Sequence, residues 1–119
     1  MHTYKDLIVW QKSIELAKKM YVLTQQFPKQ EQYGLVSQMN RAAVSIPSNI
    51  AEGKLRQSPK EFRQFLFIAF ASGGELETQI EIAKSLEELQ HINFSEAEEL
   101  LIEIMKMLNK LLSTLNPKA

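Results

Sequence analysis

The feature that most constrains this chain is the spacing of its apolar residues, which recur three and four positions apart along four separate segments. Because an α-helix has 3.6 residues per turn, this spacing places the apolar side chains on one helix face, whereas a strand needs alternation at every second residue. Only 4 glycines and 4 prolines interrupt the 119 residues. The sequence therefore predicts an all-α protein with a single domain over residues 1–119.

The first predicted helix covers about residues 6–26 and stops before Pro28. It carries two apolar stripes, which lie roughly 100° apart around the helix axis. One stripe contains Leu7, Trp10, Ile14, Ala17, Tyr21 and Thr24, and the other contains Val9, Ser13, Leu16, Met20, Leu23 and Phe27. A small bundle needs one stripe per helix, so we expect the second stripe to be exposed on an isolated chain and covered by another copy. This apolar surplus predicts an oligomer.

The second predicted helix begins near Glu31 and ends at Gly53, a residue type that commonly terminates helices. Pro47 lies inside this segment, yet the apolar spacing continues across it without a slip. A new helix starting at Pro47 would have Ile46 as its N-cap, and isoleucine has no side-chain acceptor for that position. We therefore expect one continuous helix that is kinked at Pro47.

The third predicted helix has the clearest start in the chain, because Ser58 and Glu61 form a capping box. Its apolar spacing continues to about residue 89. Gly73 lies in the middle of this helix, where glycine costs on the order of 1 kcal/mol relative to alanine. We interpret Gly73 as a notch that lets another helix approach closely.

The fourth predicted helix opens with a second capping box, Ser95 with Glu98, and ends before Pro117. All four helices are connected by short links. Short links favour neighbouring helices that run in opposite directions, so the sequence predicts an antiparallel, up-down-up-down four-helix bundle.

Polar residues follow one face of the second helix and continue on the third. They are Gln38, Arg41, Ser45, Asn49 and Glu52 on the second helix and Ser72, Glu75 and Gln79 on the third. If the two helices form a hairpin, Arg41 lies opposite Ser72 and one turn from Glu75, so we expect Arg41 and Glu75 to pair directly or through Ser72. The residues then form either a polar pocket or a buried network that fixes the helix register or a contact between subunits, and we favour the network.

Basic residues cluster around the turn between the second and third helices: Lys54, Arg56, Lys60 and Arg63. On one chain they form a modest patch, but in a ring of identical chains the patch would be repeated and could hold phosphates. No aromatic residue suited to base stacking is interleaved with them, so any nucleic acid would be bound without sequence preference. The chain as a whole has no net charge, although residues 1–64 carry ten Lys and Arg against five Asp and Glu.

The sequence lacks the residues that several kinds of chemistry require. Cysteine is absent, which excludes disulfides and thiolate chemistry. Glu88 and His91 have the Glu-x-x-His spacing of metal-binding bundles, but a single copy leads us to expect no metal and no cofactor. No phosphate-binding loop or catalytic triad is visible, so we do not expect an enzyme. With no long apolar run and no signal peptide, we expect a cytoplasmic protein that does not enter a membrane.

Four stretches of the chain resemble a known family. They are DLIVWQKS (6–13), FPKQEQYGL (27–35), QMNRAAVSIPSNIAEG (38–53) and SGGELETQ (72–79). They are similar to the bacterial four-helix-bundle proteins encoded within intervening sequences of 23S ribosomal RNA genes, over residues 4 to about 90. The resemblance implies a ring-like homopentamer. Accessory proteins of diversity-generating retroelements, a related group, share the pentamer and are thought to bind RNA and a reverse transcriptase; they are strongly basic, whereas this chain is neutral.

These observations lead to a hypothesis for function. We expect a non-enzymatic, oligomeric helical-bundle scaffold or adaptor whose leading partner is RNA or a protein that processes nucleic acid. The first alternative is a protein-interaction module that binds no nucleic acid. The second is a bundle that binds a small molecule, or an enzyme, through the polar faces of the second and third helices.

Overall fold

The computed structural model describes residues 3–115, which form four α-helices and three short 3-10 turns without any strand. The helices are α1 (Ile8–Thr24), α2 (Leu35–Leu55), α3 (Pro59–Ser85) and α4 (Ser95–Thr114), and the turns are η1 (Tyr4–Asp6), η2 (Lys29–Glu31) and η3 (Glu87–Leu89). The prediction of an all-α protein with four helices is confirmed.

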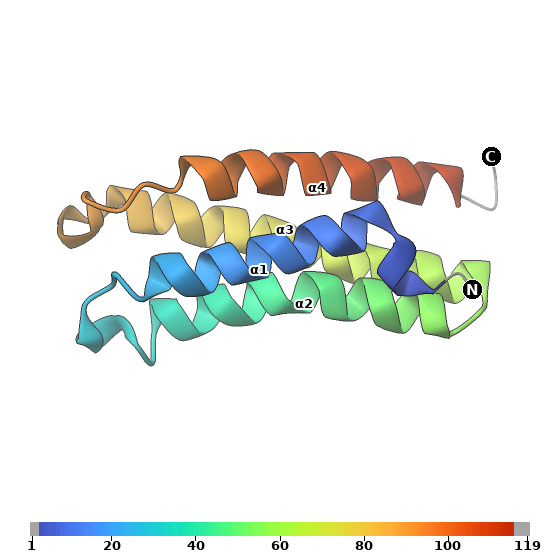
Figure 1. Cartoon of the computed structure of the whole chain (residues 1–119), viewed down its shortest axis with the longest axis horizontal. Coiled ribbons are helices and arrows are strands. Elements are labelled where there is room, and N and C mark those ends of the chain that lie inside the picture. Colours follow the sequence, from blue (N-terminus) through green and yellow to red (C-terminus); the bar gives the residue numbers. More distant parts are fainter. Residues whose placement is uncertain (1–2, 116–119) are drawn as a thin grey trace.

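The four helices lie side by side in an elongated bundle with extents of 46 × 27 × 22 Å (Figure 1). Successive helices are joined at alternating ends: the α1–α2 and α3–α4 connections lie at one end, and the α2–α3 turn lies at the other (Figure 1). α2 packs against α1 and α3, and α4 packs against the same two helices. Each helix therefore contacts two others and turns one side to the outside.

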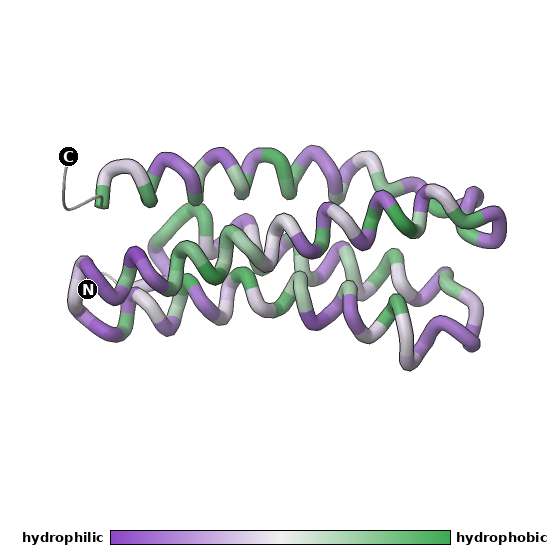
Figure 2. Tube along the Cα trace, turned by 180° about the vertical axis from the view of Figure 1, so that it is seen from behind, coloured by the Kyte–Doolittle hydropathy of each residue, from purple (hydrophilic) through white to green (hydrophobic). Residues whose placement is uncertain are grey.

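The core runs along the centre of the bundle and draws on all four helices. Figure 2 shows hydrophobic residues returning at short intervals between hydrophilic ones along each helix. The largest fully buried side chains are Leu16, Met20, Met39, Ile46, Ile50, Leu66, Leu76, Ile80, Leu89, Leu101, Ile104 and Leu108. Most of them lie on α2, α3 and α4, where apolar residues recur three and four positions apart, because burial of apolar surface is what holds an amphipathic helix in place.

The apolar stripe of α1 that we expected to be exposed is instead the one that fills the core. Leu16 and Met20 have no exposed surface within the single chain, and Val9 has 2%. In the other stripe, Trp10 is only half-buried and Tyr21 is 51% exposed. The expectation of an exposed second stripe is therefore wrong. Both stripes have the same spacing, so periodicity alone could not tell which of them faces the core.

α2 passes through Pro47 as one helix, which confirms the predicted continuity. Its ends differ from the prediction. It starts at Leu35, because Lys29–Glu31 form a separate 3-10 turn, and it continues past Gly53 to Leu55. Gly53 is buried, and a Cβ atom added there would lie 2.6 Å from the Cβ atom of Phe65. Gly53 therefore does not end the helix but lets α3 approach it closely.

Gly73 fulfils the predicted role of a packing notch, since an added Cβ atom would overlap the sulfur of Met105 on α4. The adjacent Gly74 is different. A Cβ atom at Gly74 would have nothing within 4 Å of it. Packing within the chain thus explains the glycine at position 73 but not the one at position 74.

The predicted start of α3 is confirmed, because the Ser58 hydroxyl accepts a hydrogen bond from the backbone N–H of Glu61 at 3.3 Å. The other half of the predicted capping box does not form, since the Glu61 carboxylate lies 3.4 Å from Arg56 instead. The helix ends at Ser85, earlier than expected, and η3 follows it.

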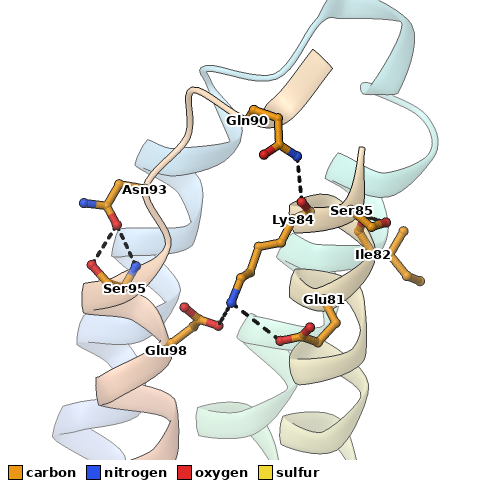
Figure 3. Close-up of polar contacts among 8 residues, drawn as sticks. All are labelled: Glu81, Ile82, Lys84, Ser85, Gln90, Asn93, Ser95 and Glu98. Atoms are coloured by element: carbon orange, nitrogen blue, oxygen red, sulfur yellow. Dashed lines mark hydrogen bonds and ion pairs between the residues drawn. The ribbon is translucent and has the colours of Figure 1, made fainter. Parts of the chain in front are cut away.

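The predicted capping box of α4 is wrong. Ser95 is the first residue of the helix and not its N-cap, and Asn93 Oδ1 accepts hydrogen bonds from the Ser95 backbone N–H at 3.0 Å and from its hydroxyl at 2.7 Å (Figure 3). Glu98 reaches across to Lys84 on α3 instead, at 2.8 Å. The carboxylate that we assigned to the cap thus connects two helices.

Candidate functional site

Part of the predicted polar network exists between α2 and α3. The hydroxyl oxygens of Ser45 and Ser72 lie 2.8 Å apart, and Asn49 Nδ2 donates to the Ser45 hydroxyl at 2.9 Å and to the Ser45 carbonyl at 2.8 Å. Because α2 and α3 are linked by a short turn, this contact fixes the register of a helical hairpin. Ser45, and not Arg41, lies opposite Ser72, so the predicted register was off by one helical turn.

Gln79 is also buried, with 5% of its surface exposed, but it does not join this network. Its Oε1 atom is buried and has no hydrogen-bond partner within the described part of the chain. A buried amide oxygen without a partner costs about 1–3 kcal/mol of desolvation. Gln79 therefore weakens the folded chain unless something outside the chain satisfies it.

The remaining members of the predicted network are exposed in the chain: Gln38, Arg41, Glu52 and Glu75. No hydrogen bond or ion pair joins Arg41 to Glu75 within residues 3–115, so the prediction that they pair inside one chain is wrong. Glu52 pairs with Arg56 instead, at 3.1 Å. The buried network thus consists of Ser45, Asn49 and Ser72, and it fits a structural role better than a pocket.

The basic turn, which we define as Lys54, Arg56, Lys60 and Arg63, lies at the end of the bundle where α2 meets α3 (Figure 1). Two of its members already have partners. Arg56 lies 3.1 Å from Glu52 and 3.4 Å from Glu61, and the hydrogen bond to Glu52 raises the pKa of the guanidinium further above its already high value. Arg63 Nε donates to the carbonyl of Leu112 at 3.3 Å.

Aromatic rings lie beneath three of these cations, which the sequence analysis missed. Lys54 Nζ is 5.4 Å from the ring centre of Phe62, and the guanidinium carbons of Arg56 and Arg63 are 5.0 and 4.7 Å from the rings of Phe65 and Phe67. The signal was present in the sequence, since Arg63 and Phe67 are four residues apart on one helix. The basic turn is therefore a mixed cationic and aromatic surface.

A shallow hollow of about 290 Å³ opens beside the basic turn, lined by Gly53, Lys54, Gln57, Ser58, Pro59, Phe62 and Leu115. Lys54 and Lys60 form no ion pair with any residue in the range 3–115. These two ammonium groups could therefore bind an added anion without first giving up a carboxylate, and so could Arg63, which bonds to a backbone carbonyl.

The opposite end of the bundle is acidic and is held by ion pairs. Lys84 Nζ bonds to Glu98 at 2.8 Å and lies 3.6 Å from Glu81 (Figure 3). The hydrogen bond to Glu98 raises the pKa of the Lys84 ammonium, with the charges of both carboxylates adding to the effect. These contacts clamp α3 to α4 next to their connection.

The structure does not place Glu88 and His91 in a metal site. His91 Nε2 lies 3.4 Å from the carbonyl of Gln26, and no group of three or more His, Asp or Glu side chains in residues 3–115 is arranged to hold a metal ion. No helix in the same range is both long and apolar enough to cross a membrane.

The sequence was compared with known proteins. No curated protein matches it. A family model described as 23S rRNA-intervening sequence protein matches residues 5–110, which is most of the chain and includes all four helices except the end of α4. The chain therefore belongs to the 23S rRNA-intervening sequence protein family.

Proposed function

We propose that this protein is a non-enzymatic scaffold: an antiparallel, up-down-up-down bundle that assembles with copies of itself into a ring-like homopentamer in the bacterial cytoplasm. RNA, or a protein that processes nucleic acid, is its leading partner. The number five rests on the family resemblance alone. Self-assembly has separate support from the surface of the chain.

The observation that carries the proposal is the apolar surface left over once the core is complete. The exposed large apolar side chains are Ile8, Tyr21, Val22, Tyr33, Val44, Leu55, Phe67, Ile68, Ile82 and Ile102. Half of them lie on α2 and α3. Water-exposed apolar side chains favour association, because burying each of them stabilises a complex.

The basic turn supplies the proposed contact with RNA. It contains two lysines that form no ion pair in the described chain, and it also contains aromatic rings. The lysines suit phosphates, and the rings suit unstacked bases. In a cyclic assembly the turns of all copies lie on one rim, and each additional phosphate contact multiplies the affinity. Because most of the contacts would be to phosphate, binding should fall steeply with salt.

Light scattering at micromolar concentration tests the assembly, since a monodisperse mass near 13.7 kDa would contradict it. Fluorescence anisotropy with a labelled single-stranded RNA tests the partner, at about 50 and 200 mM salt. Lys54→Glu with Lys60→Glu should abolish binding. Lys106→Glu, an exposed lysine on α4, is the matched control and should leave most of the binding intact.

A second candidate is a protein-interaction module without nucleic acid. Neutralisation of Arg56 by Glu52 and Glu61, together with the bond from Arg63 to Leu112, favours it because half of the basic turn is already occupied. An assembled protein with no measurable RNA affinity at about 50 mM salt would support this candidate over the first.

A further inference from the structure

The outer faces of α2 and α3 each carry a stripe with the spacing of a helix–helix contact. On α2 the stripe consists of Arg41, Val44, Ser48, Ala51 and Leu55, and on α3 it consists of Gln64, Ile68, Ala71, Glu75, Thr78 and Ile82. All of these residues are exposed except Ala51, which is half-buried. Alternating steps of three and four are what coiled-coil seams use, yet neither stripe has a partner helix within the described chain.

The charges of the two stripes are complementary. The α2 stripe has one charged residue, Arg41, and the α3 stripe has one of opposite sign, Glu75. Neither side chain forms a hydrogen bond or an ion pair within residues 3–115, whereas several other exposed carboxylates on α3 and α4 do. A single charge of each sign, set among small and apolar residues, is the pattern that fixes the register of two helices.

The sizes of the side chains match in one alignment of the stripes. When the two helices run in opposite directions with Arg41 opposite Glu75, Val44 faces Ala71 and Ile68 faces Ser48. Large side chains then meet small ones, as interdigitated helices require.

Gly74 borders the α3 stripe and supplies a separate observation. It lies inside a helix, where glycine costs about 1 kcal/mol relative to alanine, and nothing in the described chain lies within 4 Å of the missing Cβ atom. Close approach of a helix from outside the chain would give this glycine the role that Gly53 and Gly73 have inside it.

We propose that α2 of one copy packs antiparallel against α3 of the next copy, with Arg41 and Glu75 paired across the contact. This inference rests on the proposed self-assembly and adds the surface that performs it. The Arg41–Glu75 pair, which does not form within a chain, forms between chains.

This contact also meets one condition for a closed assembly. In an antiparallel helix pair, the numbers of two residues that face each other have a constant sum, which defines the register. This sum is 117 for Ser45 and Ser72 within the chain and 116 for Arg41 and Glu75 across the contact. The two registers agree to within one residue, about 1.5 Å of helix rise, so each new copy is added with almost no shift along the helix axis. The absence of an axial shift is one of the two conditions for a closed ring, and a rotation between copies that divides a full turn is the other.

Charge reversal tests the contact. Arg41→Glu and Glu75→Arg should each weaken assembly by about tenfold or more in the concentration for half-dissociation, because each sets like charges opposite one another. Both residues are exposed, so each variant should keep the helical circular dichroism of the parent. Glu77→Arg, an exposed carboxylate on the same helix but outside the stripe, is the matched control and should assemble as the parent does.

Mixing the two variants separates a contact between chains from one within a chain. In an equimolar mixture, the glutamate introduced at position 41 of one variant faces the arginine introduced at position 75 of the other, and the unchanged Arg41 faces the unchanged Glu75. Assembly should therefore recover in part relative to either variant alone, because a ring of five cannot alternate two chains throughout and keeps at least one contact between like charges. Recovery only when both substitutions are in the same chain would overturn the proposal, as would single variants that assemble like the parent. A monomeric parent protein would instead overturn the proposed self-assembly itself.

Discussion

The hydroxyl oxygens of Ser45 and Ser72 meet at 2.8 Å and tie the middle of α2 to the middle of α3. Asn49 donates to the same Ser45 hydroxyl, so the three side chains satisfy one another beside the core. A polar contact in this position tolerates only one register, because a shift by one turn would leave a hydroxyl buried without a partner.

Replacing Ser72 with alanine should therefore lower the free energy of unfolding by about 1 kcal/mol. Urea denaturation followed by circular dichroism measures it. A double-mutant cycle with Ser45→Ala should give a coupling energy well above zero, and Ser113→Ala, an exposed serine on α4, should change stability very little. Additive effects of the two serine substitutions would contradict the contact.

Replacing Gln79 with methionine should raise the free energy of unfolding by about 1 kcal/mol. The change removes a buried oxygen that has no hydrogen-bond partner in the described chain and keeps a similar volume. The midpoint of urea denaturation, measured below the assembly concentration, should rise without a change in slope. A lower midpoint would mean that the amide of Gln79 makes a bond that stabilises the fold.

The glycines of the helices should respond differently to alanine. Gly53→Ala should destabilise the chain by about 1–3 kcal/mol, because its Cβ atom would meet the rigid start of the Phe65 side chain. Gly73→Ala should cost less, since Met105 is flexible and can move.

Gly74→Ala should increase stability by up to about 1 kcal/mol through helix propensity, because its Cβ atom meets nothing in the described chain. Thermal unfolding of Gly53→Ala, Gly73→Ala and Gly74→Ala, compared side by side below the assembly concentration, gives the order of their stabilities. A loss of stability at Gly74 equal to that at Gly53 would contradict the packing described for both.

The clamp between α3 and α4 should make stability depend on alkaline pH. The folded state raises the pKa of Lys84 through its bond to Glu98, so the contribution is fully present below the ordinary lysine value near about 10.4. It is lost as pH rises through the higher folded value. The difference in Tm between the parent and Lys84→Met should thus be present near about pH 9 and shrink above about pH 11. The control Lys106→Met, which removes an exposed lysine without an ion pair in the described chain, should show a small difference at both pH values.

The sequence predicts the helices well because each has a strong local signal. Ser58 starts α3 through its own hydroxyl, and the stripe through Leu66, Leu76 and Ile80 is buried as expected. Local signals fail where the outcome depends on another helix. Gly53 looks like a helix stop in the sequence, yet α2 continues past it. The position is a glycine because Phe65 on the neighbouring helix leaves room only for hydrogen.

The candidate site was harder to predict for the same reason. A shift of one helical turn in the hairpin register moves Arg41 away from Ser72 and leaves Glu75 exposed, and nothing in either helix alone specifies that shift. The rings beneath Lys54 and Arg56 come from α3, while the cations lie on α2 and at its C-terminal end. Such pairs become visible only when the two helices are placed together.

The 46 Å length of the bundle separates its basic end from its acidic end, although the net charge is zero. The basic turn lies at one end, and the acidic connection with Glu87 and Glu88 lies at the other (Figure 1). At physiological ionic strength, electrostatic potentials decay over a screening length of about 8 Å, so the two ends are several screening lengths apart. A polyanion that approaches the protein therefore interacts with the charges of the nearer end and not with the net charge of zero. The end with the basic turn attracts it, and the acidic end repels it.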